Sequence, residues 1–377
     1  MHWDTLFTRP AALVRRGGRF VVADLLTPHL VLSTSAVTGG QSTAVRHLVN
    51  HQSCEGSGHG ARAHLMVELG QDGYHRRICG EINLDPDAAA TMGTAANMQY
   101  AAIVSAADDG LEATAIVTAG VQTNAVCAGD PAHWRETADG VVKATTVTGT
   151  INTMLLINTP VAAPALARVV VTMTEGKSAA LQRLAVPSCY SPDLATGTGT
   201  DQFCVAAPLG PGKPLTSASP HMKLGELVGR ATRDATLEAL RWQNGLEPSY
   251  TRGLFHALGR YGVTEATVFD ALAPLLDAGD LELLRRNSKA AFYEPLVGAA
   301  AHALAAVLDR RRHGTLPESA AAGAVVHEAA TLAASLAAQP HRWPEFRQQL
   351  HAIDAAEPRH LVLAAIALGW REKWRSS

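Results

Sequence analysis

The feature that most constrains the fold is a change in hydrophobic pattern near residue 246. Before it, short runs of β-branched and apolar residues alternate with turns rich in Gly, Pro, Asn and Asp, which is typical of strands. After it, apolar residues recur at helical spacing, as in residues 268–276 and 295–308, which indicates amphipathic helices. The sequence therefore predicts a layered α/β (α+β) core over residues 1–245 and an all-α extension over residues 246–377.

Local signals predict individual elements within these two parts. Residues 20–26 and 30–36 flank Pro28 and predict a hairpin. We expect a helix to begin at Asp85, and residues 196–201 to form a loop. Further predicted elements are strands at 98–105, 112–117, 150–158 and 203–207, helices at 164–184 and 224–243, and roughly four to seven helices in the extension.

Composition narrows the functional class. Of 377 residues 47% are hydrophobic and 18% charged, so the chain can bury a sizeable core. A net charge of −2 argues against a nucleic-acid partner. Neither a signal-peptide pattern at Met1 nor an apolar run long enough to span a membrane is found. Five scattered cysteines without a C-x-x-C pair predict reduced thiols and a cytoplasmic protein. Homo-oligomerisation is left open.

Polar loops at predicted strand ends are the candidate site. The run from Thr196 to Asp201 alternates threonine with glycine and ends in a carboxylate, which suits contact with a ligand or an oxyanion. Two further loops contain Asn124 and Asn152, whose amides both donate and accept, and Asp130 is a possible base. Ordinary turn chemistry is the alternative interpretation of each loop.

Two apparent motifs fail on spacing. The run Glu175-Gly176-Lys177-Ser178 resembles the end of a phosphate loop, but Val171 stands where that loop requires glycine. Glu175 and Lys177 are two residues apart and do not share a helix face.

Histidines in the N-terminal third invite a metal interpretation. His51, Cys54, His59 and His64 match no zinc spacing, so no metal site is predicted. His51 is more plausible as a polar contact or proton carrier. With no G-x-S-x-G elbow present, the nucleophile of any hydrolytic reaction would be a threonine, a serine or water.

Eight segments follow one another along the chain: STSAVTGG (33–40), NHQ (50–52), VTAGVQTNA (117–125), AGD (128–130), GTIN (149–152), TEGK (174–177), TGTGTD (196–201) and KLGELVG (223–229). In this order they resemble one family, the adenosylcobinamide amidohydrolases (CbiZ family) of corrinoid salvage. The resemblance covers roughly residues 20–245 and rests on the number and order of the segments. Gly176 departs from the alanine expected between the Glu and the Lys, which weakens the expectation of a helical turn there.

The resemblance implies hydrolysis of the amide that joins the aminopropanol arm to the corrin ring, which gives adenosylcobyric acid. It implies a corrinoid substrate that carries its own cobalt, and no added cofactor. Such chemistry needs an attacking oxygen, a base, an oxyanion site and an acid. The candidates are Thr198 or Thr200 for the hydroxyl, Asp130, Asp201 or Glu175 for the base, the N–H groups of Gly197 and Gly199 for the oxyanion, and Lys177 or His51 for the acid. The expected substrate-binding residues are Asn50, Gly120, Asn124, Thr150 and Asn152, with Gly197 and Gly199.

Other interpretations stay open at this stage. The protein could be a non-catalytic corrinoid binder or sensor, or an amidase or acyltransferase acting on another small amide. The strand, helix and Gly/Thr loop also resemble those of ornithine acetyltransferases and DmpA aminopeptidases, which would imply a layered α/β core and a hydroxyl nucleophile. If both carboxylates act, Asp201→Asn and Glu175→Gln should each lower turnover at least about tenfold.

Overall fold

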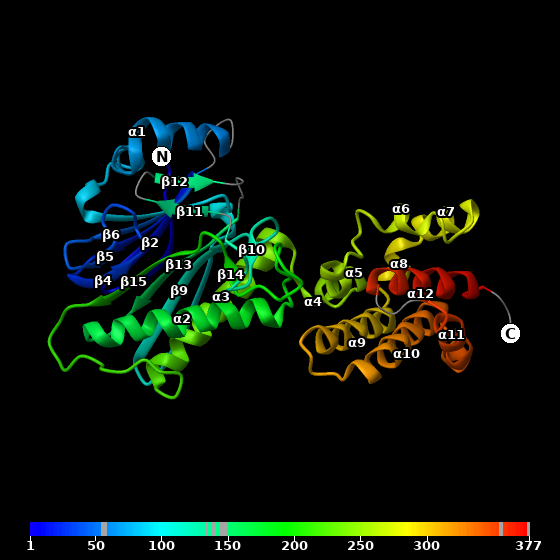
Figure 1. Ribbon diagram of the computed structural model, residues 1–377. Helices are drawn as coiled ribbons and strands as arrows, with labels where there is room; N and C mark the ends of the chain where they lie inside the picture. Colours follow the sequence, from blue (N-terminus) through cyan, green and yellow to red (C-terminus); the bar gives the residue numbers. More distant parts are fainter. Residues whose placement is uncertain (54–58, 133, 138–139, 144–148, 354–356, 375–377) are drawn as a thin grey trace. The chain divides into compact units, whose positions relative to one another are not determined.

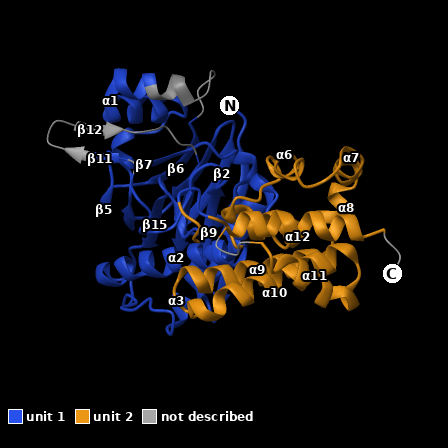
Figure 2. Ribbon diagram, turned by 45° about the vertical axis from the view of Figure 1, so that its right-hand side comes forward, with its two compact units in different colours: residues 1–184, 188–190, 194–246 blue, residues 185–187, 191–193, 247–377 orange. Residues whose placement is uncertain are grey.

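The structure of the protein is a computed structural model that describes residues 1–53, 59–132, 134–137, 140–143, 149–353 and 357–374 (Figure 1). Figure 2 colours its two compact units. The α/β unit comprises Met1–Leu184, Ser188–Tyr190 and Leu194–Leu246, and the helical unit comprises Ala185–Pro187, Ser191–Asp193 and Glu247–Ser377. The main division follows Leu246, one residue beyond the expected boundary.

The α/β unit is built on two mixed sheets. In the first sheet the order is β1 (Asp4–Arg9), β2 (Ala12–Gly17), β3 (Phe20–Leu25), β6 (His47–Gln52), β7 (Ala89–Thr94). In the second it is β5 (Gly40–Ser42), β4 (His29–Ser33), β15 (Gln202–Pro208), β13 (Ile151–Ile157), β9 (Leu111–Ala119), β8 (Ala102–Asp108). Two short ribbons pair β10 (Ala125–Val126) with β14 (Gly197–Thr198), and β11 (Trp134–Thr137) with β12 (Gly140–Lys143).

Helices cover the outer faces of both sheets (Figure 1). Helix α1 (His59–Glu81) packs Ile78 against Phe20 of the first sheet, whereas α2 (Ala163–Arg183) and α3 (Lys223–Asn244) pack on the second. The inner faces of the sheets meet in a core that includes Leu48 and Met154. The layer order is α–β–β–α, which confirms the predicted α/β class.

Several predicted elements are confirmed. β8 and β9 form a hairpin around Asp109-Gly110, and β13, α2 and β15 lie where the sequence placed them. Helix α3 ends at Gly245, whose φ of 64° is the left-handed conformation that favours glycine at a helix C-terminus.

The hairpin predicted over residues 20–36 is wrong. β3 pairs with β2 and β6, whereas β4 pairs with β5 and β15, so the turn at Pro28 carries the chain from one sheet to the other. An alternating pattern identifies a strand but does not identify its partner.

The helix predicted from Asp85 is also wrong, and the predicted loop at 196–201 contains β14. Asp85 caps only a short 3₁₀ turn, Pro86–Ala88, before the chain extends into β7. Ala89, Ala90 and Met92 are fully buried, so burial between layers outweighs the helix propensity of alanine. Strands β1 and β2 and helix α1 were not anticipated.

The helical unit confirms the predicted helical region but contains more helices than expected. Short helices such as α4 (Pro248–Thr251) and α8 (Ser288–Phe292) are too brief to produce a periodic pattern. The remaining helices are α5 (Leu254–Leu258), α6 (Val268–Leu272), α7 (Ala278–Arg286), α9 (Pro295–Arg312), α10 (Glu318–Ala337), α11 (Trp343–Leu350) and α12 (Pro358–Glu372).

Helix α10 is, among the described residues, the one helix long and apolar enough to cross a membrane. Of its most apolar window, 56% is buried inside the protein. It packs against α9, α11 and α12.

Candidate active site

The core between the two sheets changes from apolar to polar at one end. On β6, β9 and β13, side chains two residues apart share a face. The inward row of β6 runs from Leu48 to Asn50, and that of β13 runs from Met154 to Asn152. Thr118 continues the inward row of β9 in the same way. These three polar side chains are at most 2% exposed.

Hydrogen bonds among these side chains join the sheets. The amide of Asn50 donates to Thr118 Oγ1 (2.7 Å), and the amide of Asn152 donates to Asn50 Oδ1 (2.9 Å) and to the Gly93 carbonyl (3.2 Å). Gln202 Oε1 accepts from the Gly93 N–H at 3.0 Å. Buried amides are costly without partners, so this network fixes the end of the inter-sheet core.

A second cluster lies where α2 faces the second sheet. Asp201 Oδ1 accepts from the Ile151 N–H (2.9 Å) and from the Thr198 hydroxyl (2.5 Å). Its Oδ2 accepts from the Thr198 N–H (3.1 Å) and from Lys177 Nζ. The side chains of Lys177 and Asp201 are only 15% and 18% exposed. Four donors therefore converge on the one carboxylate of Asp201 and fix its position.

Two glycines make this arrangement possible. A Cβ on Gly197 would lie 2.5 Å from Asp201 Oδ2 and 2.6 Å from Lys177 Nζ, so a larger residue would displace the pair. A Cβ on Gly176 would lie 2.8 Å from the Gly229 carbonyl of α3. The sequence suggested that Gly176 would weaken a helical turn. Instead, α2 continues through Gly176, and the missing side chain permits close packing of α2 on α3.

A third group surrounds Asn124, whose amide donates to the Gly149 carbonyl (2.8 Å) and to Thr200 Oγ1 (3.4 Å). Its Oδ1 accepts from the Tyr190 hydroxyl at 3.0 Å. Thr150 connects this group to the others, because its hydroxyl donates to the Thr200 carbonyl (2.6 Å) and lies 3.5 Å from Asn152 Oδ1.

A pocket of about 200 Å³ opens beside the charged pair. The pocket therefore exposes a carboxylate, an ammonium and apolar surface to one small volume. Its lining is Thr34, Ile151, Thr153, Met173, Thr174, Lys177, Asp201, Gln202 and Phe203.

The profile of the adenosylcobinamide amidohydrolase (CbiZ) family matches residues 8–248. The chain belongs to this family. An uncharacterized protein of Methanocaldococcus jannaschii is 32% identical over 183 residues, which are 46% of this chain and 71% of that protein. The region that the family profile matches spans both sheets, α2 and α3, and so includes all three polar clusters. CbiZ is an amidohydrolase family, which makes hydrolysis of an amide the family-level chemistry.

Most of the candidate residues in this CbiZ-family chain lie together. Gly120 donates its N–H to the Thr150 carbonyl (3.0 Å), and the Gly199 N–H contacts the Asn124 carbonyl at 3.4 Å. The predicted residues that the structure brings to the same end of the second sheet are Asn50, Gly120, Asn124, Thr150, Asn152, Lys177, Gly197, Thr198, Gly199, Thr200 and Asp201.

Three candidates lie outside these clusters. Glu175 is on the exposed face of α2, and Asp130 accepts from the Cys127 N–H (2.8 Å) and the Ser188 hydroxyl (2.6 Å). His51 faces away from Asn50, between Phe20 and Tyr74, with Nδ1 2.9 Å from the Met92 carbonyl. Their catalytic roles stay predictions.

The histidines and the cysteine that invited a metal interpretation lie only partly within the described residues. Cys54 and the His59 side chain lie outside the described part of the chain. Within the described part, no three His, Cys, Asp or Glu side chains form a group that could hold a metal ion.

The environment of the two buried thiols, Cys79 and Cys204, disfavours a role for either as a nucleophile. Burial raises the pKa of Cys204 to about 12 and that of Cys79 to about 11. Both therefore stay protonated near neutral pH and are poor nucleophiles.

Some site residues were missed by sequence reasoning. Gln202 directly follows Asp201 and continues the inward row of β15, so strand alternation could have indicated it. Phe203 is the next residue of β15 and belongs to its other face. Met173 and Tyr190 have no such signal, because only the packing of α2 and of the loop that follows it brings them to this end of the sheet.

Proposed function

We propose that this protein hydrolyses the amide that joins the aminopropanol arm to the corrin ring of adenosylcobinamide. Water is consumed, the C–N bond breaks, and adenosylcobyric acid and aminopropanol are released. Membership of the CbiZ family supports the substrate class. The observation that carries the chemistry is the contact of one carboxylate, Asp201, with both the Thr198 hydroxyl and the Lys177 ammonium.

Each member of this triad has a role in the proposal. Asp201 accepts the proton of the attacking oxygen, which is either the Thr198 hydroxyl or a water held in its place. The ammonium of Lys177 stabilises the negative charge that develops on the carbonyl oxygen, and then supplies the proton that the leaving amine needs. The N–H of Gly197 is the proposed additional oxyanion donor, whereas the N–H of Gly199, the other expected donor, already contacts the Asn124 carbonyl at 3.4 Å.

In this proposal the buried amides keep the site residues in place and position the substrate. Asn50 and Asn152 cross-link the two sheets, and Asn124 fixes Thr200 beside Gly149. Because these side chains are already ordered before substrate binds, little free energy is lost in organising them. Thr34 and Phe203, at the pocket wall, are the proposed contacts for the apolar part of the substrate.

The cellular setting is part of the same proposal. The described cysteines (Cys79, Cys127, Cys189 and Cys204) are reduced thiols, which suits a cytoplasmic enzyme of cobamide salvage. We propose that no resident cofactor is needed, since cobalt enters with the substrate. Turnover that survives incubation with EDTA would support this, and a loss restored by one metal ion would contradict it.

The deciding experiment is incubation of the full chain with adenosylcobinamide, followed by mass spectrometry of the corrinoid. We expect adenosylcobyric acid and free aminopropanol in equal amounts. Tight corrinoid binding without product would favour a binder or sensor instead. Absence of both, with hydrolysis of other small amides, would favour a different amidase.

A second experiment assigns the attacking oxygen. Thr198→Ser keeps a hydroxyl next to Asp201, whereas Thr198→Ala removes it. If Thr198 attacks, Thr198→Ser retains most of the turnover, Thr198→Ala loses about 10²-fold or more, and rapid quenching traps an acyl-enzyme. Similar rates for both variants would assign the attack to water.

A further inference from the structure

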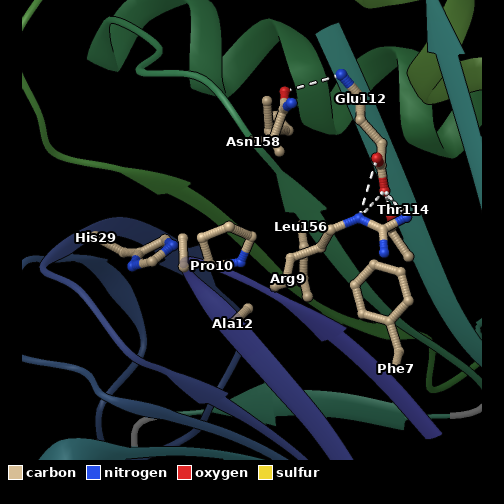
Figure 3. A pocket seen from close by; sticks show the side chains of 11 residues that line it. Phe7, Arg9, Pro10, Ala12, His29, Glu112, Thr114, Leu156 and Asn158 are labelled. Atoms are coloured by element: carbon tan, nitrogen blue, oxygen red, sulfur yellow. Dashed lines mark hydrogen bonds and ion pairs between the residues drawn. The ribbon is translucent and has the colours of Figure 1, made fainter. Parts of the chain in front are cut away.

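A second pocket lies at the opposite end of the second sheet from Asp201. Strand β13 connects the two places, because the N–H of Ile151 binds Asp201 while Ile157 lines the second pocket. Six residue steps at about 3.3 Å separate them by roughly 20 Å. The cavity measures about 200 Å³. It is lined by Phe7, Arg9, Pro10, Ala11, Ala12, His29, Glu112, Thr114, Leu156, Ile157 and Asn158 (Figure 3).

One polar atom of a buried side chain that lines this pocket lacks a hydrogen-bond partner among the described residues. His29 is 2% exposed, and its Nδ1 lies 2.7 Å from the Thr27 carbonyl. A carbonyl only accepts, so Nδ1 carries the hydrogen and Nε2 of the neutral ring is left as an acceptor. Burial, together with Arg46, lowers the pKa of His29 and keeps the ring neutral. The described residues offer no hydrogen-bond donor to Nε2.

The charged side chains of the pocket compensate each other. Arg9 Nε lies 3.1 and 3.2 Å from the two carboxylate oxygens of Glu112, and the Thr114 hydroxyl donates to Glu112 Oε1 at 3.0 Å. The Arg9 guanidinium also stacks 4.4 Å from the Phe7 ring centroid. Figure 3 shows this group and His29 on opposite sides of the pocket. With no unpaired charge to satisfy, the pocket favours a neutral ligand.

The size and the lining of the pocket define the size and the polarity of the rest of the ligand. An apolar cavity of about 150 Å³ in another protein is known to hold benzene, so about 200 Å³ accommodates one or two small rings. The walls offered by Phe7, Pro10, Ala12 and Leu156 are apolar. A ring system that fills the pocket would remove this apolar surface from water, which favours binding.

We propose that this pocket is a second ligand site, which binds a small neutral ring molecule that donates one N–H or O–H hydrogen bond to Nε2 of His29. The site is separate from the amidohydrolase site and does not depend on the reaction assigned to Asp201. Its ligand class differs from the corrinoid substrate in size.

A pair of probes of the same shape tests the hydrogen bond. Indole presents an N–H where benzofuran presents an oxygen, which would face the lone pair of Nε2. Binding to the full chain is measured by ligand-observed saturation-transfer NMR titration. We expect saturable indole binding and about 2- to 13-fold weaker binding of benzofuran, which is the loss expected for one hydrogen bond. Equal affinities for the two probes, or no indole binding, would overturn the proposal.

Variants test the location. Ala11→Phe places a large side chain in the cavity while His29 is kept, and should abolish indole binding, whereas His29→Phe should equalise the two probes. His2→Phe is the matched control, because the His2 side chain is 90% exposed and outside the pocket. If His29→Phe does not fold, Ala11→Phe still decides. Undiminished indole binding by folded Ala11→Phe would show that indole binds elsewhere and would overturn the proposal.

Discussion

The two units of this protein bury different kinds of side chain. In the helical unit, Thr251 and His256 are the only buried polar side chains among the described residues. The α/β unit buries many more, among them Asn50, Asn124 and Asn152. The apolar core of the helical unit is built largely from alanine and leucine of α9, α10 and α12.

The buried side chains of the two units serve different purposes. Buried amides lower stability unless each polar atom is bonded, and those of the α/β unit are bonded across strands and sheets at one end of the core. A purely apolar core would hold the sheets together equally well. The polar end is therefore explained by the site it positions, whereas the helical core is explained by burial alone.

The largest effect that the comparison predicts is on stability, in the helical unit. Trp370 is 1% exposed and its Nε1–H donates to the Asp280 carbonyl at 3.0 Å. We expect Trp370→Ala to lower the free energy of unfolding of this unit by about 3–5 kcal/mol, because it leaves a large cavity. Urea unfolding followed by circular dichroism measures it. Trp374→Ala, at a 65% exposed position, should change stability by less than about 0.5 kcal/mol.

The next effect is on turnover, in the α/β unit. Asp201→Asn removes the charge opposite Lys177 and should lower kcat/KM about 10²–10³-fold, with folding retained by circular dichroism. Glu175→Gln is the matched variant, since Glu175 is the exposed carboxylate two residues from Lys177 on α2. Sequence reasoning gave both carboxylates a role, and the geometry ranks Asp201 first. A larger loss in Glu175→Gln would reverse that ranking.

The close approach of the Gly197 backbone to Asp201 and Lys177 provides a test with a smaller expected effect. Gly197→Ala places a methyl group against both Asp201 and Lys177, and the displaced pair should lower turnover about 10- to 10²-fold. Gly210→Ala is the control, because nothing lies within 4 Å of a Cβ there. Wild-type kinetics in a folded Gly197→Ala variant would show that the contact of Lys177 with Asp201 is not needed for the reaction.

The smallest effects concern bonded and unbonded polar groups within one unit. Asn152→Ala leaves the Asn50 and Gly93 oxygens without a donor and should cost about 1–3 kcal/mol of stability. Thr232, on α3, is fully buried and its hydroxyl has no partner among the described residues. Thr232→Val should therefore be neutral or stabilising by about 1 kcal/mol. Thermal unfolding measures both, and equal destabilisation would contradict this distinction.

Much of the α/β unit could be predicted from local signals. Proline and glycine marked the ends of α2 and α3, and the polar loops at strand ends indicated Asn124, Asn152 and Asp201. Pairing could not be predicted, because β3 and β4 are adjacent in sequence yet belong to different sheets. Strand order depends on which apolar faces meet, and a period of two residues carries no information about that.

The sequence by itself determined which side chains could take part, through a Gly/Thr loop that ends in a carboxylate and a lysine inside a helical run. Only the tertiary structure decided which of them meet. Glu175 and Lys177 are about 200° apart around α2, and periodicity does not say which one faces the sheet. Packing of α2 on the second sheet turns Lys177 inward to Asp201, 24 residues later in the chain, and leaves Glu175 in solvent.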